Sequence, residues 1–322
     1  MPKKIFAITI VIGIALGCLF WMLKSNQDFV KLDKAVGSKL RIVTTTTMVT
    51  DLVRIVAGDD AAVTGLMGPG VDPHSYQVTF NDTAALQKAD LIFYSGQHLE
   101  GKMQDVLVKR AEKYGAVFAV TDGIEKSNLL MPEEEFQGYY DPHVWGDPKL
   151  WAKCIKVVAN ALSEADPGRA EDYQRRADDY HSELLALGEW VRQRISEVPS
   201  SQRVLVTSHD AFNYFGQAYG IQVRGLQGIS TNSESGLKDR AELVAFIKER
   251  QLKTIFPESS VNAKGIKAVA AEAGVKVSEH ELFSDAMGEP GDLVDLHGET
   301  YDKGSYIGMI KHNVNTVVDG LK

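Results

Sequence analysis

The chain has 322 residues, of which 44% are hydrophobic and 24% are charged. This composition is typical of a folded protein and excludes a disordered one, and the length predicts two lobes, each with its own core. The net charge of −8, with no lysine- or arginine-rich block, argues against a nucleic-acid partner.

Residues 1–24 have the features of an export leader or a membrane anchor. Two lysines precede an apolar run, 5–23, that is long enough to span a bilayer as a helix. The sequence ALGC within it resembles a lipoprotein cleavage box, so the protein is anchored either by lipid at Cys18 or by an uncleaved helix. Both alternatives predict an extracytoplasmic location, in the periplasm or on the outer face of the cytoplasmic membrane, with 25–38 as a tether. Cys154 then has no disulfide partner and is expected to be a buried apolar residue.

Strands and helices alternate along the rest of the chain, which predicts an α/β fold with mainly parallel sheets flanked by helices. The expected N-terminal lobe is 39–165 and the expected C-terminal lobe is 199–322. Short strand-like runs begin at Leu40, Ala62, Leu91, Val117, Arg203, Ile221, Thr254 and Val275.

A single long helix, 166–198, is predicted to join the lobes. Asp166 is the expected N-cap and Pro167 the first helical residue. Apolar residues then follow at steps of three or four, which places them on one face of a rigid helix. They are Tyr173, Ala177, Tyr180, Leu184, Leu187, Val191 and Ile195.

Two histidines, His74 and His143, occur in the same tripeptide, Asp-Pro-His, in connections rich in glycine and proline. Proline fixes its own backbone angle, so the histidine after it leaves the loop in a constrained direction, which suits a ligand. Asp72 and Asp141, which open the two tripeptides, are expected to form turns or hydrogen bonds to the ligands rather than to bind metal.

The second lobe supplies a matching pair. His209 stands at the end of the strand RVLVTSHD, and Asp285 lies in a glycine-containing loop after the strand VKVSEHELF. Because ligands bind outside the carboxyl ends of strands in open α/β sheets, all four side chains are expected to meet between the lobes. Three imidazoles and one carboxylate form a closed four-ligand set for zinc or manganese. Glu258 is expected either to accept a hydrogen bond from a ligand imidazole or to have an unrelated structural role.

Four motifs carry a family resemblance: GVDPHSY at 70–76, DPHVWGDP at 141–148, TSHDAFNYF at 207–215 and SDAMG at 284–288. The chain from about Leu40 onward resembles the cluster A-I (cluster 9) solute-binding proteins, the metal-binding components of zinc/manganese ABC importers. The resemblance implies two α/β lobes joined by one rigid helix. It also implies a monomer that binds one Zn²⁺ or Mn²⁺ per chain and delivers it to an ABC permease and its ATPase.

The same resemblance places the metal ligands at His74, His143, His209 and Asp285. Many zinc-specific members have a histidine-rich loop between the first two ligands, but the segment 123–140 contains no histidine. Manganese-specific members often have glutamate at the third position, whereas this chain has histidine. The ligand set thus resembles members that accept both ions. Since a site with three nitrogens and one oxygen intrinsically prefers zinc, we expect zinc to bind more tightly, with manganese as the alternative.

Two other functions remain open: a metal-dependent hydrolase and a surface adhesin. A hydrolase would use the same histidines, with a vacant metal position and Asp285 unbound. An adhesin without transport would have the four candidate ligands far apart in the fold. A serine triad is not expected, although Ser208, His209 and Asp210 are its residue types, because consecutive strand residues point to opposite faces. We therefore expect a binding protein rather than an enzyme.

Overall fold

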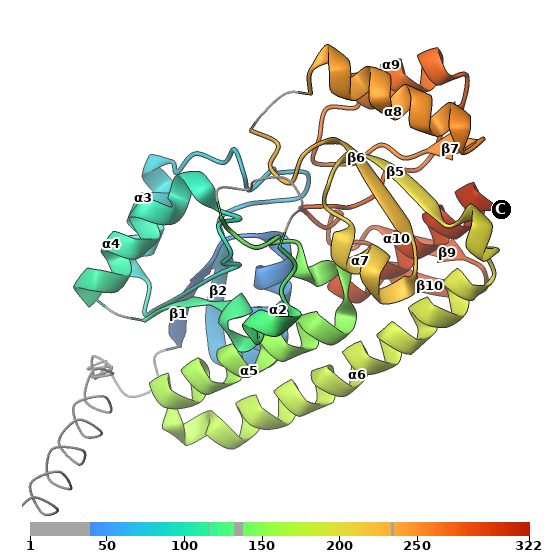
Figure 1. Ribbon diagram of the computed structural model, residues 1–322. Coiled ribbons are helices and arrows are strands. Elements are labelled where there is room, and N and C mark those ends of the chain that lie inside the picture. The colour runs from blue at the N-terminus through green and yellow to red at the C-terminus, as the bar shows by residue number, and fades with distance from the viewer. Residues whose placement is uncertain (1–38, 115, 132–137, 233–234) are drawn as a thin grey trace, which may run out of the picture.

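The computed structural model describes residues 39–114, 116–131, 138–232 and 235–322 (Figure 1). The predicted leader and tether, 1–38, lie outside the described residues. Within the part that is described, no helix is both long and apolar enough to cross a membrane. Cys154 is fully buried and unpaired, as predicted.

The N-terminal lobe contains a four-stranded parallel sheet with the strand order β2-β1-β3-β4. Its two faces follow from the alternation of side chains along a strand. Ile42 and Phe93 face one core with α2 and α5, whereas Val43 and Ile92 face a second core with α3 and α4. The strands are β1 (Leu40–Thr44), β2 (Ala61–Gly65), β3 (Leu91–Tyr94) and β4 (Val117–Ala119), and the helices are α2 (Thr47–Ala57), α3 (Phe80–Lys88), α4 (Gln104–Tyr114) and α5 (Pro148–Ala165).

The C-terminal lobe has shorter ladders. Strand β5 pairs with β6 and β7 pairs with β8, both in parallel, and the backbone bond from Phe256 to Val206, at 2.9 Å, joins the two pairs. An antiparallel hairpin, β9–β10, was not predicted. The strands are β5 (Val204–His209), β6 (Gln222–Gln227), β7 (Thr254–Ile255), β8 (Lys276–Val277), β9 (Leu293–Leu296) and β10 (Glu299–Asp302), and the helices are α7 (Asn213–Tyr219), α8 (Leu237–Glu249), α9 (Lys264–Ala273) and α10 (Tyr306–Leu321).

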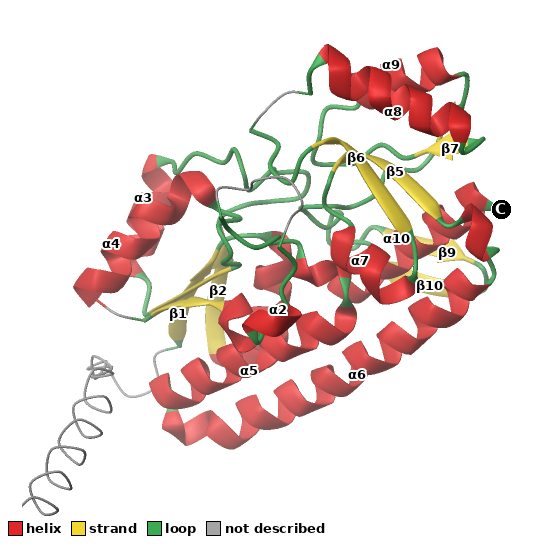
Figure 2. Cartoon of the chain, viewed as in Figure 1, coloured by secondary structure: helices red, strands yellow, loops and turns green. Residues whose placement is uncertain are grey.

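The long helix α6 (Ala170–Ser196) runs along one side of the molecule, from α5 to the β9–β10 hairpin (Figures 1 and 2). Asp166 and Pro167 open a short 3-10 turn before it, so the α-helix begins later than predicted. The predicted apolar stripe is confirmed, because all seven of its residues are buried.

The largest hydrophobic core of the described residues runs through both lobes, which was not predicted, in addition to the expected separate core in each lobe. It includes Trp151 of α5, Leu187 of α6, and Phe256 and Tyr306 from the C-terminal half. The physical reason is that α5, α6 and α10 pack together beneath both lobes, and each lobe adds only a smaller core of its own. A shared core resists rotation of one lobe against the other.

Hydrogen bonds also join the lobes. The indole Nε1 of Trp145 donates to the carbonyl of Ser284 at 2.7 Å, and the Tyr306 hydroxyl donates to the carbonyl of Trp145 at 2.7 Å. The backbone N–H of Met287 donates to the Thr47 hydroxyl at 2.8 Å. All of these groups are buried, so a hinge motion at this level would leave buried polar groups unpaired.

Candidate metal centre

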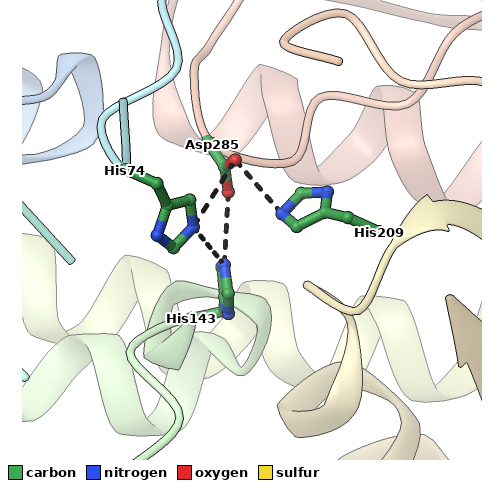
Figure 3. Close-up of side chains that lie close together, drawn as sticks. All are labelled: His74, His143, His209 and Asp285. Atoms are coloured by element: carbon green, nitrogen blue, oxygen red, sulfur yellow. Dashed lines mark hydrogen bonds and ion pairs between the residues drawn. The ribbon is translucent and has the colours of Figure 1, made fainter. Parts of the chain in front are cut away.

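Four side chains from four separate connections meet between the lobes (Figure 3). His74 follows β2, His143 precedes the turn that leads to α5, His209 ends β5, and Asp285 follows β8. One nitrogen or oxygen atom from each lies within 4.8 Å of the others, and every one of these residues is at most 1% exposed. The structure thus brings together the four predicted side chains, two from each lobe.

The separations between the donor atoms suit one small ion. The Nε2 atoms of His74 and His143 are 3.3 Å apart, and the Asp285 carboxylate lies 3.4 Å from Nε2 of His143 and 3.2 Å from Nε2 of His209. Metal bonds of about 2.1 Å at tetrahedral angles place ligand atoms about 3.4 Å apart. The distance from Asp285 to His74, at 3.9 Å, is longer, and all four donor atoms lie within 4.8 Å of one another.

Unpaired polar atoms point to the same conclusion. Among the described residues, Nε2 of His209 and both carboxylate oxygens of Asp285 are buried and form no hydrogen bond, and their nearest polar contacts are the other groups of the site at ion-pair distances. Buried polar atoms without partners are costly, and native proteins rarely retain them without a ligand or a function. A divalent cation would satisfy all three atoms at once.

Two of the imidazoles are oriented by buried carboxylates. The Nδ1 of His143 donates to Asp141 at 2.8 Å, and the Nδ1 of His209 donates to Glu258. Each carboxylate also accepts the backbone N–H of the same histidine, at 2.9 Å and 2.8 Å. The predicted contact between Glu258 and an imidazole is therefore present. These bonds place the proton on Nδ1 and leave Nε2 free for a metal.

His74 is held differently, although it occurs in the same tripeptide as His143. Asp72 accepts the backbone N–H of His74 at 2.9 Å but does not bond its ring. Within the described chain, no carboxylate bonds to Nδ1 of this histidine. The two identical tripeptides thus position their histidines by different means.

Burial and charge shift the pKa values in the site. Burial outweighs the nearby Asp285 at His74 and lowers the pKa of His74 to about 4. Burial also disfavours a charged His143, but Asp141 and Asp285 outweigh it and raise the pKa of His143 to about 9. At His209, Asp285 and Glu258 likewise outweigh burial and hold the pKa well above its usual value. Burial would raise the pKa of Asp285, but His209 and His143 hold it well below its usual range. Without metal, protons on His143 and His209 therefore offset part of the negative charge of the buried carboxylates.

Sequence reasoning missed residues that support the site from α7 of the opposite lobe, and the contact of Trp145 within the same lobe. The Asn213 side chain donates to Asp141 at 3.1 Å, and the Tyr214 hydroxyl donates to the Asp141 carbonyl at 2.9 Å. The Trp145 ring packs edge-on against His143, with 5.2 Å between ring centroids. The motifs quoted above contain all of these residues, but no local pattern indicates that α7 faces the other lobe.

No serine triad is present at His209. The His209 ring faces Glu258 on one side and Asp285 on the other. The Ser208 hydroxyl is buried and has no hydrogen-bond partner among the described residues. This arrangement agrees with the expectation that neighbouring strand residues point apart.

Comparison with known families gives one match over most of the chain. The family described as "Zinc-uptake complex component A periplasmic" (ZnuA) matches residues 42–320. The manganese-binding lipoprotein MntA of Bacillus subtilis is 42% identical over 295 residues, which cover 90% of this chain and 92% of that protein.

Solved structures agree with the sequence comparison. The periplasmic zinc-binding protein TroA of Treponema pallidum superposes with a TM-score of 0.82 at 42% identity, covering 88% of this chain and 99% of that one. The laminin-binding protein Lmb of Streptococcus agalactiae is described as bifunctional, with adhesin and metal transporting activity. It superposes with a TM-score of 0.73 at 28% identity and covers 87% of this chain and 99% of that one.

Proposed function

Because the chain belongs to the family of the periplasmic zinc-uptake component A, ZnuA, we propose that it is the solute-binding protein of a metal ABC importer. It would bind one Zn²⁺ or Mn²⁺ outside the cytoplasm at His74, His143, His209 and Asp285, and deliver the ion to an ABC permease driven by a cytoplasmic ATPase. The observation that supports this most strongly is the convergence of four buried donor atoms from His74, His143, His209 and Asp285, of which those of His209 and Asp285 form no hydrogen bond.

Zinc is the ion we propose to bind more tightly. Three imidazole nitrogens and one carboxylate oxygen follow the usual ligand preference of zinc, and zinc exceeds manganese in intrinsic affinity for such sites. Manganese is the second candidate, since the relatives include both a manganese-binding and a zinc-binding protein. Three of the donor separations already suit a tetrahedral ion.

The protein's own residues would do three things during binding. Asp141 and Glu258 hold two imidazoles in the tautomer that presents Nε2. The same two imidazoles release protons when the metal binds, so the positive charge of the ion replaces the positive charge of those protons. The shared core and the interlobe hydrogen bonds limit lobe rotation, so exchange would proceed through local loop motion.

The location and the division of the chain belong to the same proposal. We propose that the leader, 1–24, and the tether, 25–38, hold the protein at the outer face of the cytoplasmic membrane, by lipid at Cys18 or by an uncleaved helix. MntA, a lipoprotein by name, supports the first alternative. The lobes would be 39–165 and 199–322, joined by 166–198, and the protein would act as a monomer.

A hydrolase is disfavoured because Asp285 lies among the imidazoles instead of leaving a metal position open. The similarity to Lmb leaves adhesion open as an additional role. An adhesin without transport would not need to bring the four side chains together, but they do meet. We therefore propose that metal binding for transport is the primary function.

Native mass spectrometry of the detergent-solubilised full chain tests the proposal. The protein is stripped of metal and then offered zinc and manganese together in buffered competition. We expect one zinc ion per chain, and none in a variant with alanine at all four positions. One manganese ion would mean that the geometry overrides intrinsic ligand preference. Absence of any bound metal would refute the proposal, and hydrolytic turnover by the zinc-loaded protein would favour the hydrolase.

A further inference from the structure

The four candidate ligands are sealed from solvent, so an ion can enter or leave only if a part of the structure moves. Each of the four is at most 1% exposed. Lobe rotation is opposed by the shared core and by the buried hydrogen bonds at Trp145 and Thr47. The moving part should therefore be a single loop that carries one of the ligands.

His74 is the ligand whose loop is the easiest to displace. His143 is tied to Asp141 and His209 to Glu258, and both carboxylates are buried. Separating His209 from Glu258 would leave a buried carboxylate without its partner, which is strongly unfavourable. The loop of His143 is held because Asp141 is bonded to Asn213 and Tyr214 of the opposite lobe. The His74 ring has no such carboxylate partner among the described residues, so its position depends on the contacts of its backbone.

Part of the support for this loop comes from the opposite lobe, from Thr231 and Asn232, which follow β6. The Thr231 hydroxyl donates a hydrogen bond of 2.6 Å to one carboxylate oxygen of Asp72, and the same oxygen accepts a hydrogen bond from the Ser75 hydroxyl. The Asn232 side chain donates to the carbonyl of His74 at 3.0 Å. Two hydrogen bonds, one to a carboxylate and one to a carbonyl, thus span from the second lobe to the loop that carries this histidine.

We propose that Thr231 and Asn232 form a latch that holds His74 on the ion, and that His74 is the first ligand to leave when the ion is released. This inference rests on the proposed function, since it takes His74 as a ligand of the transported metal. Asn232 is exposed and Thr231 is partly exposed, so water can replace both bonds when the latch opens. The latch residues are positioning residues, and their effect should fall on the rate of release.

The test measures zinc release from the full chain by stopped-flow mixing with excess chelator. In the double variant Thr231→Val, Asn232→Ala, release should be about 4- to 100-fold faster, because each of these two partly solvated hydrogen bonds contributes roughly a factor of 2 to 10. The association rate should stay within about twofold of that of the unaltered protein. The single variant Thr231→Ser keeps both the hydroxyl and Asn232, so it should release zinc as slowly as the unaltered protein.

Matched controls remove the same kinds of bond far from the site. Thr300→Val removes a threonine–aspartate bond in the β9–β10 hairpin, and Asn128→Ala removes an asparagine–glutamate bond on the surface. Neither should change zinc release. Should the double variant fold poorly, as judged by its melting temperature without metal, Asn232→Ala alone still tests the latch, because that side chain is exposed.

Two results would overturn the latch. One is an unchanged release rate in the double variant. The other is a larger acceleration in Ser260→Ala, which loses the 2.8 Å bond to Ser284 beside Asp285 and would identify the Asp285 loop as the first to move. If the unaltered protein bound no zinc, the proposed function itself would fail. If it bound zinc and the variants released it normally, only the latch would fail.

Discussion

Replacing Glu258 with glutamine probes how the site prepares an imidazole for metal. The Glu258 carboxylate is 1% exposed, and both of its oxygens accept hydrogen bonds from His209, one from the backbone N–H and one from Nδ1. A glutamine of the same size carries one carbonyl oxygen and one NH2 group, so one of the two donors of His209 would face the NH2 group, which is itself a donor. The replacement also removes the negative charge that makes the imidazole a stronger base.

The expected loss of zinc affinity is about 10- to 100-fold at pH 8, or roughly 1.4 to 2.7 kcal/mol, which is the usual effect of altering a partner of a metal-binding histidine. The loss should shrink as the pH falls. Asp285 and, to a smaller extent, Glu258 raise the pKa of His209. Removing Glu258 therefore weakens the binding of the competing proton as well as the binding of the metal. Competition against a fluorescent chelator at several pH values measures both effects.

Glu100→Gln is the matched control for this experiment. Glu100 is also a buried carboxylate, 2% exposed, and it accepts hydrogen bonds from Thr45 and Ser95 rather than from any of the four candidate ligands. It should lower the melting temperature but leave zinc affinity unchanged. Zinc affinity within about twofold of the unaltered protein in Glu258→Gln would refute the reasoning that this carboxylate prepares His209.

Three further predictions use the same measurements. His209→Ala should lose most zinc affinity and remain folded, as followed by chelator competition and circular dichroism, and unaltered binding would remove this residue from the site. Zinc affinity should fall as the pH drops, because the raised pKa values of His143, about 9, and His209 keep both protonated near neutrality. Since each displaced proton weakens binding about tenfold per pH unit, calorimetry at pH 7 should detect proton release, and equal affinity at about pH 8 and about pH 5 would contradict the model. Burial raises the pKa of Asp51 to about 6, so its stabilising contribution is present at low pH and is lost as the pH rises through about 6. Asp51→Asn should therefore raise the melting temperature at pH 8 but not at pH 4, and a lower melting temperature at pH 8 would contradict this.

Local sequence signals predicted the parts of the fold that depend on local physics. The eight strand starts and the buried stripe of α6 follow from periodicity, which reflects burial of one face of an element. The β9–β10 hairpin was missed because its strands are short and charged, and Leu293 is 65% exposed, so little apolar alternation marks them. The shared core was missed because the pattern of one helix does not reveal which partner it packs against.

The candidate site was predictable for a similar reason. His74, His143 and His209 stand beside prolines or at a strand end, and such positions are visible in the sequence. Thr231 and Asn232 carry no comparable signal, because a polar loop residue looks the same whether it faces water or the opposite lobe. Long-range contacts of this kind depend on how the lobes pack together, and the sequence pattern does not specify that packing.

The most direct test of the central claim is a diffraction measurement on crystals of the zinc-loaded protein at the zinc absorption edge. We expect one anomalous peak between the lobes. The ion should lie about 2.0 to 2.2 Å from Nε2 of His74, His143 and His209 and from the Asp285 carboxylate. A peak elsewhere, or a water molecule bound to the ion in place of Asp285, would contradict a closed site built to carry metal.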